Sequence, residues 1–332
     1  MDTAQINMGF QKHIIAVGGG KGGIGKSVIC TNLAVGLALS GKNVVLVDTD
    51  FGSANLHALL GINFPTHGFM DYFHNNSSDL QSLLLETGIG KLKLVCAAGD
   101  NPGSANIDSK SLETIKSFIR NLEADYIFLD LAPGANYSVI DFFNLGHTGL
   151  VLTTPEMTSV MSTFSFIRAS LFRQISEAFK EQPEIRKLVD HSNPAHADME
   201  TYCIDVLKEK LIDMDPAHES TVESIVNSFK PQLVVNRVRY KQELSVGESL
   251  IQLVKKYLGV ELNYLAYLME SDRVRDSVDE MVPFLMKEPE SNPSKNLKKI
   301  INALTDTEAQ LTTHNGEAFA TQHGKVSSGK NT

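Results

Sequence analysis

Several features that define whole classes of protein are missing from this sequence. No apolar run approaches the roughly 18 to 20 residues that a membrane-spanning helix needs, and the chain does not begin with a charged leader and an apolar stretch. Its three cysteines, Cys30, Cys96 and Cys203, form no CxxC or CxC pair, which argues against a zinc ribbon or a cysteine-ligated cluster within one chain. We therefore expect a cytoplasmic, unexported protein with free thiols.

Positive charge is also in short supply. The 332 residues include 30 Lys and Arg against 39 Asp and Glu, which gives a formal net charge of −9. A surface built throughout to attract nucleic acid or anionic lipid would need the opposite balance. Hydrophobic residues make up 42% and charged residues 21%, as in ordinary globular proteins, so the chain can fold into one large α/β domain or two modest ones.

Buried strands alternate with helical segments along most of the chain. A β-rich run at His13–Val17 ends in glycines, the apolar positions from Lys26 to Leu39 fit a helix that Gly41 closes, and Asn43–Val47 is a second buried strand. Further strands are expected at 92–95, 126–129, 148–153, 232–235 and 262–268. This order predicts a doubly wound α/β domain over 13–304, with a mostly parallel sheet of about seven to eight strands.

Some segments do not follow this alternation. Residues 171–230 are too long for one crossover helix and carry charged, helix-favouring sequence, so we expect a helical insertion that is either a passive extension or a docking surface. Residues 1–12 and 305–332 are polar and unpatterned, and flexible ends are expected there. Ser294–Leu304 is interpreted as the last core helix, with a basic membrane-surface helix as the alternative.

The strongest motif follows the first expected strand. Gly19–Ser27 has the sequence GGKGGIGKS, which contains the pattern GxxxxGK[ST] at a strand-to-helix junction. The backbone N–H groups of such a loop, together with the partial positive charge of the helix N-terminus, bind phosphate. Lys26 can reach between the β- and γ-phosphates, and the Ser27 hydroxyl can ligate Mg²⁺. The sequence therefore predicts a nucleotide-binding loop.

Carboxylates follow two of the expected strands. Asp48 and Asp50 come directly after the strand at 43–47, and Asp130 closes the strand at 126–129. Ligands bind at the carboxyl ends of strands in open α/β sheets, so we expect these groups beside the phosphate loop. One carboxylate can hold the water shell of a metal ion, and another can orient or deprotonate an attacking water. Asp130 has the Walker B arrangement, which binds Mg²⁺ through water.

The second lysine of the loop, Lys21, makes a family resemblance specific. GKGGIGKS resembles the deviant Walker A motif of the MinD/ParA family of ATPases, and VDTDFGSAN at Val47–Asn55 resembles its D-x-D-x-G-x-x-N segment. TTPEMTS at Thr153–Ser159 and the pair Asn236-Arg237 resemble two further family segments. Within the family, VDTDFGSANLHALLGI and VLTTPEMTS are most similar to the MinD-like flagellar-number regulators FlhG/FleN.

Motif and resemblance together imply roles for named residues. In the family the equivalent of Lys21 reaches the nucleotide of the other subunit, the equivalent of Asp50 activates water, and an Asn at position 236 pairs with adenine. The stretch 268–273 falls where relatives line the base, although it lacks their usual proline. The implied catalytic residues are Lys21, Lys26 and Asp50, and the implied metal residues are Ser27, Asp48 and Asp130, with the carboxylates acting through water. The implied nucleotide contacts are Gly20, Lys21, Gly22, Gly23, Ile24, Gly25, Lys26, Ser27, Val28, Asn55, Asn236 and Arg237.

The resemblance implies an ATPase that uses Mg²⁺ and dimerises when it binds ATP. Slow hydrolysis to ADP would make it a switch over the number or position of a cellular structure, flagella in the FlhG-like hypothesis, with a flagellar GTPase or switch component as partner. The N-terminus MDTAQINMGF lacks the DQAxxLR-type segment of typical FlhG proteins, and a terminal amphipathic membrane helix is missing.

The sequence also fits several alternative functions. They are a ParA-type DNA-partitioning ATPase, which the negative charge disfavours, a regulator of the cell-division site, an iron–sulfur carrier and a non-hydrolysing scaffold. A peripheral position at the inner face of the cell membrane also stays open.

Overall fold

The structure is a computed structural model that describes residues 12–53, 55–63, 65, 67–75, 80–97, 107–191 and 203–305. The two ends expected to be flexible, 1–12 and 305–332, lie outside the described residues except for Lys12 and Thr305.

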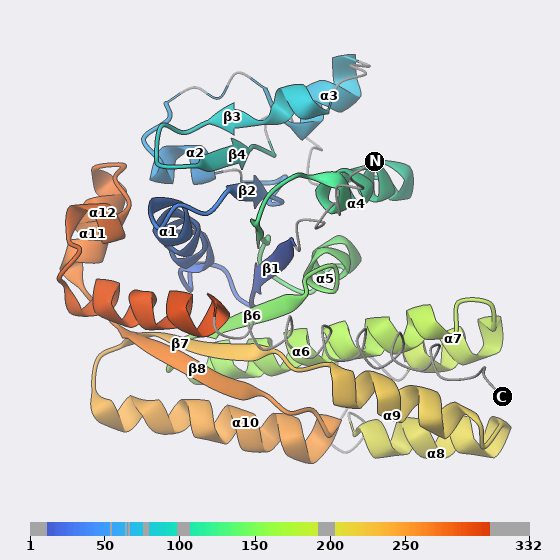
Figure 1. The fold of residues 1–332 in the computed structure, drawn as a ribbon. Coiled ribbons are helices and arrows are strands. Elements are labelled where there is room, and N and C mark those ends of the chain that lie inside the picture. The colour runs from blue at the N-terminus through green and yellow to red at the C-terminus, as the bar shows by residue number, and fades with distance from the viewer. Residues whose placement is uncertain are drawn as a thin grey trace, which may run out of the picture.

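A central eight-stranded sheet organises the described chain (Figure 1). Its strands follow the order β3-β4-β2-β5-β1-β6-β7-β8, and all neighbours are parallel except the pair β3 and β4. The strands are β1 His13–Gly18, β2 Val44–Asp48, β3 Leu85–Glu86, β4 Leu92–Val95, β5 Tyr126–Asp130, β6 Thr148–Thr153, β7 Gln232–Val238 and β8 Asn263–Met269. The doubly wound, mostly parallel α/β fold expected from the sequence is confirmed.

Helices connect these strands and cover both faces of the sheet (Figure 1). The α-helices are α1 Lys26–Leu39, α2 Leu56–Leu59, α3 Phe69–Asn75, α4 Ser109–Asn121, α5 Tyr137–Phe143, α6 Met157–Ala178, α7 Pro183–His191, α8 Ile204–Met214, α9 His218–Ser228, α10 Ser245–Leu258, α11 Asp272–Asp279 and α12 Phe284–Lys287. Two short 3-10 helices, η1 Gln81–Leu83 and η3 Lys241–Leu244, and a last helix over 292–305 complete the described elements.

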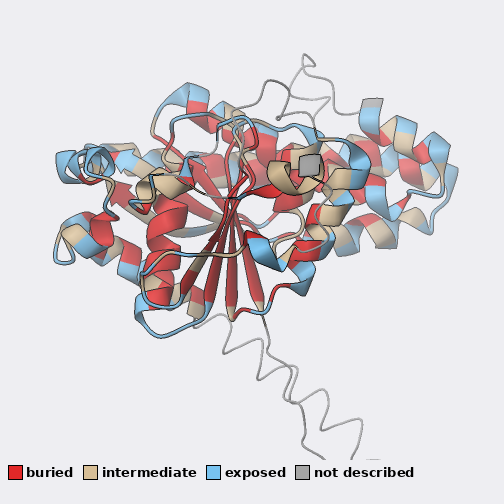
Figure 2. Ribbon diagram, turned by 90° about the horizontal axis from the view of Figure 1, so that it is seen from above, coloured by how far each residue is buried: buried red, intermediate tan, exposed pale blue. Residues whose placement is uncertain are grey.

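Two apolar cores lie on opposite faces of the sheet. Ile15 and Val17 of β1 pack with α1, α12 and the last helix, whereas Ile14 and Ala16 pack with helices α4 to α10. Successive side chains of a strand point to opposite faces, so a strand covered on both sides reads as a continuous apolar run. Figure 2 shows the result: buried residues fill the strands and the inward sides of the helices.

The last helix belongs to one of these cores. Leu297, Ile300, Ile301 and Leu304 are all buried, and a Cβ at Gly36 of α1 would collide with the Ile301 side chain. The absence of a side chain at Gly36 therefore lets the two helices approach closely. The interpretation of 294–304 as a core helix is confirmed, because its apolar face is already covered within the chain.

Strands β1, β2, β5 and β8 differ from the expected bounds by one residue, and three differences are larger. The strand β7 continues through Asn236 to Val238, because a bulge with Arg237 at φ 57° lets the chain rejoin β8 instead of leaving the sheet. The two-residue strand β3 was not expected. The helical insertion expected at 171–230 does not begin a new element, because Leu171 lies inside α6. The helices α7 to α9 that follow share the apolar core on the α4–α10 face of the sheet. Residues 192–202 lie outside the described part.

Candidate functional site

The glycine loop joins β1 to α1 at the carboxyl edge of the sheet. A Cβ at Gly20 would overlap the backbone carbonyl of Ser162 in α6, and one at Gly25 would overlap the Asn236 amide. Gly25 has φ 95° and caps α1, which has neither a side-chain cap nor an acidic residue in its first turn. The first backbone N–H groups of α1 therefore keep their full affinity for an anion. Glycine is required here because the loop is packed tightly from two sides.

Lys26, the first residue of α1, lies almost fully buried behind the loop. Its Nζ donates a hydrogen bond to the Lys21 carbonyl at 3.3 Å, which folds the side chain back along the loop. Burial lowers the pKa of Lys26, and the negative charges of Asp130 and Asp50 oppose that shift. The ammonium group therefore lies close enough to both carboxylates to be affected by their charge, and a further anion would offset its lost hydration.

Asp130 ends β5 between the loop strand β1 and the strand β2. It pairs in register with Val17 on one side and Asp48 on the other. Its Oδ1 atom is buried and has no hydrogen-bond partner among the described residues. Burial raises the pKa of Asp130 to about 7, although a hydrogen bond with the Ser27 side chain favours the ionised form. A buried carboxylate oxygen without a partner, next to a serine hydroxyl, is a donor set that suits Mg²⁺.

Asp48 is buried at the end of β2 and holds the following loop closed. Its Oδ1 accepts a hydrogen bond from the Asp50 N–H at 3.0 Å, and its Oδ2 accepts one from the Leu56 N–H at 3.4 Å. Burial, followed by the charge of Asp130, raises the pKa of Asp48 well above its usual range. Both oxygens are thus committed to backbone N–H groups, so the geometry supports a role in shaping the loop more directly than one in holding a metal.

Thr49 ties the same loop to the neighbouring strand. Its backbone N–H and its hydroxyl both donate to the Asp130 carbonyl oxygen, at 3.0 Å and 2.7 Å. The residue is buried, and the two bonds join the segment after β2 to the segment after β5. In the sequence, Thr49 is marked only by its position between two acidic residues at a strand end, and its role was not predicted.

Asp50 and Asn55 lie on the loop that Asp48 closes. Asp50 is half-buried and close enough to influence the pKa of both Lys26 and Asp130, and its Oδ1 accepts a bond from the Gly52 N–H at 3.2 Å. Asn55 is exposed, and its amide donates to the Ser53 carbonyl and hydroxyl oxygens. The structure therefore gathers Asp50 with the loop lysine and Asp130, whereas the Asn55 amide makes local bonds.

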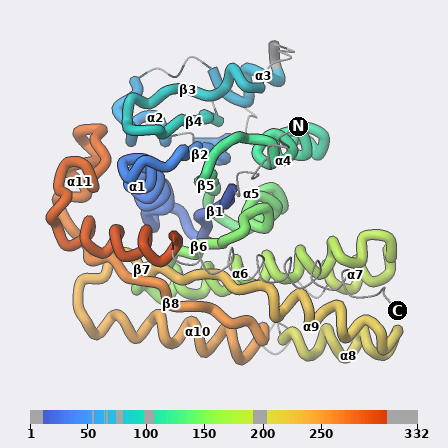
Figure 3. The backbone as a smooth tube through the Cα atoms, viewed as in Figure 1, coloured from blue at the N-terminus to red at the C-terminus, as the bar shows by residue number. Residues whose placement is uncertain are grey.

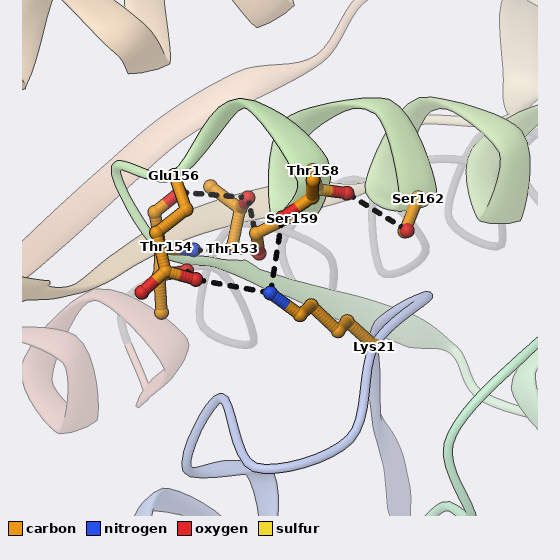
Figure 4. A network of polar contacts seen from close by, with 7 residues as sticks. All are labelled: Lys21, Thr153, Thr154, Glu156, Thr158, Ser159 and Ser162. Atoms are coloured by element: carbon orange, nitrogen blue, oxygen red, sulfur yellow. Dashed lines mark hydrogen bonds and ion pairs between the residues drawn. The ribbon is translucent and has the colours of Figure 1, made fainter.

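Lys21 extends from the loop to the start of α6 (Figure 4). Its Nζ lies 3.1 Å from Glu156 Oε2 and donates to Thr158 Oγ1 at 3.0 Å. The hydrogen bond with Lys21 lowers the pKa of Glu156. Thr153, Thr154 and Ser159 continue this network, with the Ser159 hydroxyl accepting the Thr154 N–H at 3.0 Å. The segment TTPEMTS, found as a motif, proves to be the contact surface of Lys21 within its own chain.

A cavity of about 320 Å³ opens beside the loop. Gly25 of the loop and Val28 of α1 line one side of it. Asn236 and Arg237 line it from β7, and Leu268, Met269, Glu270 and Ser271 from β8 and the turn after it. The Asn236 amide nitrogen donates to the Ile24 carbonyl oxygen at 2.8 Å, and its oxygen makes no hydrogen bond with the other described residues, so this oxygen remains for a guest in the cavity. The volume lies within the range of about 300 to 1,000 Å³ that is typical of small-molecule sites.

Taken together, these elements place most of the predicted residues around one loop. The described residues contain no group of three or more His, Cys, Asp or Glu arranged to hold a metal ion directly. No described helix is long and apolar enough to cross a membrane. The arrangement offers loop N–H groups and a lysine for phosphates, a serine and a lone carboxylate oxygen for a hydrated cation, and an adjoining cavity for a base.

Comparison with known proteins identifies relatives of this arrangement. The model of the CbiA family, described as the CobQ/CobB/MinD/ParA nucleotide binding domain, matches residues 15–284. The chain is 31% identical to the antiactivator FleN of Pseudomonas aeruginosa over 160 residues, which make up 47% of this chain and 55% of that protein. It is 32% identical to the septum site-determining protein MinD of Helicobacter pylori over 148 residues, 44% of this chain and 54% of that protein. The chain thus matches about half the length of these curated relatives.

A solved structure resembles the whole fold. The septum site-determining protein MinD of Pyrococcus horikoshii, complexed with Mg-ADP, aligns with a TM-score of 0.60 and 18% identity, covering 88% of this chain and 96% of that one. At this identity the likeness concerns the fold alone. The family model covers most of the sequence, and the resemblance first seen in the deviant Walker A motif is confirmed. The chain therefore belongs to the CobQ/CobB/MinD/ParA nucleotide-binding domain family.

Proposed function

We propose that this protein is an ATPase that binds Mg-ATP, dimerises in that state and hydrolyses the nucleotide slowly as a molecular switch. One observation carries the proposal most directly: the buried Asp130 Oδ1 lacks a partner among the described residues, beside the Ser27 hydroxyl and the buried Lys26. A purely structural strand end would leave neither a buried carboxylate oxygen unpaired nor a lysine desolvated.

Each residue of the loop then has a task. The loop N–H groups and Lys26 bind and orient the phosphates, and the Asn236 amide oxygen accepts from the base, with Val28 and Arg237 at the edge of the cavity. Ser27 and Asp130 would hold Mg²⁺, which supplies charge neutralisation at the phosphates. Asp50 orients the attacking water, and Asp48 and Thr49 hold Asp50 in place through the loop.

Lys21 is the residue that makes a dimer part of the proposal. Within the chain its ammonium group is bound by Glu156 and Thr158 through exposed contacts, and exposed ion pairs contribute at most about 1 kcal/mol. That energy is small enough for a phosphate of a second subunit to replace it. Dimerisation thus exchanges a weak contact within the chain for a stronger one with the partner's nucleotide.

The biological setting proposed is the control of the number or position of a cellular structure. The likeness to FleN supports flagella, with a flagellar GTPase or switch component as the partner, and the likeness to MinD supports the site of cell division as the alternative. A DNA-partitioning role fits the formal charge of −9 less well. A peripheral membrane position is compatible with either of the first two settings.

Light-scattering mass measurements with and without Mg-ATP test the switch. Asp50→Ala should accumulate as an ATP-bound dimer, because the dimer forms but hydrolysis does not reset it. Lys21→Ala should bind nucleotide and remain monomeric, whereas Lys180→Ala, at an exposed lysine of the helical region, should behave as the unmodified chain. A Lys21→Ala protein that dimerises normally would contradict the proposal. ATP-dependent, salt-sensitive retention on random-sequence DNA would favour partitioning instead.

A further inference from the structure

A buried asparagine joins the helix after the phosphate loop to a distant part of the chain. Asn32 lies on α1 and is 3% exposed. Its amide nitrogen donates to the Val28 carbonyl oxygen in the same helix at 2.8 Å, and its amide oxygen accepts the Leu285 N–H of α12 at 2.9 Å. The second bond joins residues that are 253 positions apart in the sequence. Asn32 therefore links two helices whose separation the chain itself does not fix.

Helix α12 needs an acceptor from outside for its first turn. Its N-cap residue is Pro283, which provides no side-chain cap. The N–H groups of Met286 and Lys287 both bond to the Pro283 carbonyl oxygen. The Leu285 N–H comes before them and, like the first N–H groups of any helix, has no acceptor within its own helix. A buried N–H without a partner destabilises a fold, so the Asn32 oxygen supplies the acceptor that α12 lacks.

The same helices form two walls of the cavity beside the phosphate loop. Figure 3 shows α1 in blue and α11 in orange on the same flank of the sheet, although they come from distant parts of the chain. Val28 and Ile29 line the cavity from α1. The second wall, here called the α11–α12 wall, comprises Val274, Arg275, Val278 and Phe284. Asn32 thus donates to a residue of the first wall and accepts from the residue that follows Phe284 in the second.

Helix α11 buries little of its own surface and is held through α12. Of its eight residues, Ser277 alone is buried. Arg273 Nη1 lies 2.9 Å from Oε2 of Glu288, the residue directly after α12. Lys287 Nζ of α12 lies 2.7 Å from Oε1 of Glu280, the residue directly after α11. These contacts tie α11 to α12, so a displacement of α12 from α1 also displaces α11.

We propose that Asn32 is a positioning residue for the nucleoside: it holds the α11–α12 wall at the distance from α1 at which the cavity binds base and sugar. The side chain is nearly fully buried, so it acts through α12 and not by touching the ligand. In the proposed function the loop and Lys26 bind the phosphates, whereas α11 and α12 line the cavity. Loss of the bond should therefore weaken binding of the nucleoside and spare that of the phosphates. This inference rests on the proposed nucleotide-binding function.

Titration calorimetry with two ligands tests this role. Mg-ADP probes the whole site, and Mg-tripolyphosphate, which has no base or sugar, probes the phosphate loop alone. Asn32→Leu keeps the branched shape of the side chain and removes both hydrogen bonds. It should weaken Mg-ADP binding at least about tenfold, while tripolyphosphate affinity stays within about twofold. Thr31→Val is the matched control: Thr31 is fully buried, and its hydroxyl has no hydrogen-bond partner among the described residues, so both affinities should stay unchanged.

A second variant separates this role from a general loss of stability. Asn32→Thr introduces a hydroxyl that can bond to the Val28 carbonyl oxygen but is too short to reach α12. It should therefore show the same selective loss of Mg-ADP affinity as Asn32→Leu. In ATP turnover, both variants should raise KM at least about tenfold and leave kcat within about twofold, because binding of the base is shared by the ground state and the transition state.

The outcomes separate this inference from the proposed function. Equal Mg-ADP affinity of Asn32→Leu and the unmodified chain, or an equal loss of Mg-ADP and tripolyphosphate affinity in both variants, would refute the positioning role. In either case the proposed nucleotide site stands, because the unmodified chain binds both ligands. If the unmodified chain binds neither ligand, the proposed function itself is wrong, and this inference is wrong with it.

Discussion

Neutralising Asp130 should stabilise the protein when nucleotide and metal are absent. The carboxyl is buried at 2% exposure, and its pKa is raised to about 7 from the ordinary 3.8, with burial as the first cause. That difference corresponds to about 4 kcal/mol of unfavourable free energy when the group is ionised in the folded chain. Asp130→Asn keeps the shape of the side chain and removes the charge, so it should recover most of this energy.

The pH dependence of the effect has a definite sign. A group with a raised pKa in the folded chain binds its proton more tightly there than in the unfolded chain. Its contribution to stability is therefore fully present at a pH below its pKa in the unfolded chain, and it is lost as the pH rises through its pKa in the folded chain. The advantage of Asp130→Asn should therefore be close to zero at pH 3, about 3 kcal/mol at pH 6 and about 4 kcal/mol at pH 8. Above pH 8 it should level off.

Urea unfolding with EDTA present measures this directly. The chain contains no Trp, so far-UV circular dichroism is the appropriate signal. The free energy of unfolding of both proteins would be compared at several pH values, with Asp213→Asn, an exposed position on α8, as the control for a lost carboxylate. An advantage that does not change with pH, or a loss of stability at pH 8, would refute the argument that burial of this charge destabilises the empty site. Added Mg-ATP should reverse the ranking, because the charged carboxylate holds the cation's water shell more strongly than the neutral amide does.

Substitutions at three further residues test other parts of the structure. In Gly20→Ala the new Cβ collides with the backbone of α6, so the loop must shift. Nucleotide affinity should fall at least about tenfold in a fluorescent-nucleotide titration, which corresponds to about 1.4 kcal/mol of binding free energy. Thr49→Val removes the hydrogen bond from the hydroxyl to the Asp130 carbonyl oxygen, and it should cost about 1 kcal/mol of stability and lower ATP turnover. Thr49→Ser keeps the hydroxyl and should retain both. Equal ATP turnover of the two variants would contradict a role for this hydrogen bond in holding Asp50 in place. Burial, followed by the charge of Lys12, lowers the pKa of His147, whose Nδ1 accepts a hydrogen bond from the Ile14 N–H at 2.9 Å. The neutral histidine therefore supports stability above pH 6.5, and this contribution is lost as the pH falls. His147→Gln should flatten the fall in the free energy of unfolding between pH 7 and pH 5.

Local patterns in the sequence were enough to predict seven of the eight strands and the phosphate loop. The helix at Lys26–Leu39 and the strands at 92–95 and 148–153 have the predicted bounds, because apolar periodicity and glycine positions act within a few residues of chain. Strand order placed Asp130 beside Asp48, as expected from their positions at the ends of parallel strands. Family resemblance supplied the proposed roles of Lys21 and Asn236, which composition and periodicity do not contain.

The contacts of those residues were decided only by the tertiary structure. Lys21 meets Glu156 across 135 residues, and Asn236 reaches the Ile24 carbonyl across 212. Such pairs depend on strand order, register and the bulge at Arg237, which no short window of sequence specifies. The amino-acid sequence by itself therefore determined that a phosphate loop exists and what chemistry surrounds it. Packing between distant segments decides which atoms stay without a partner among the described residues, such as Asp130 Oδ1 and the Asn236 amide oxygen. The physical reason is that an atom stays unpaired only when the donors near it, which come from other segments, bond to other acceptors.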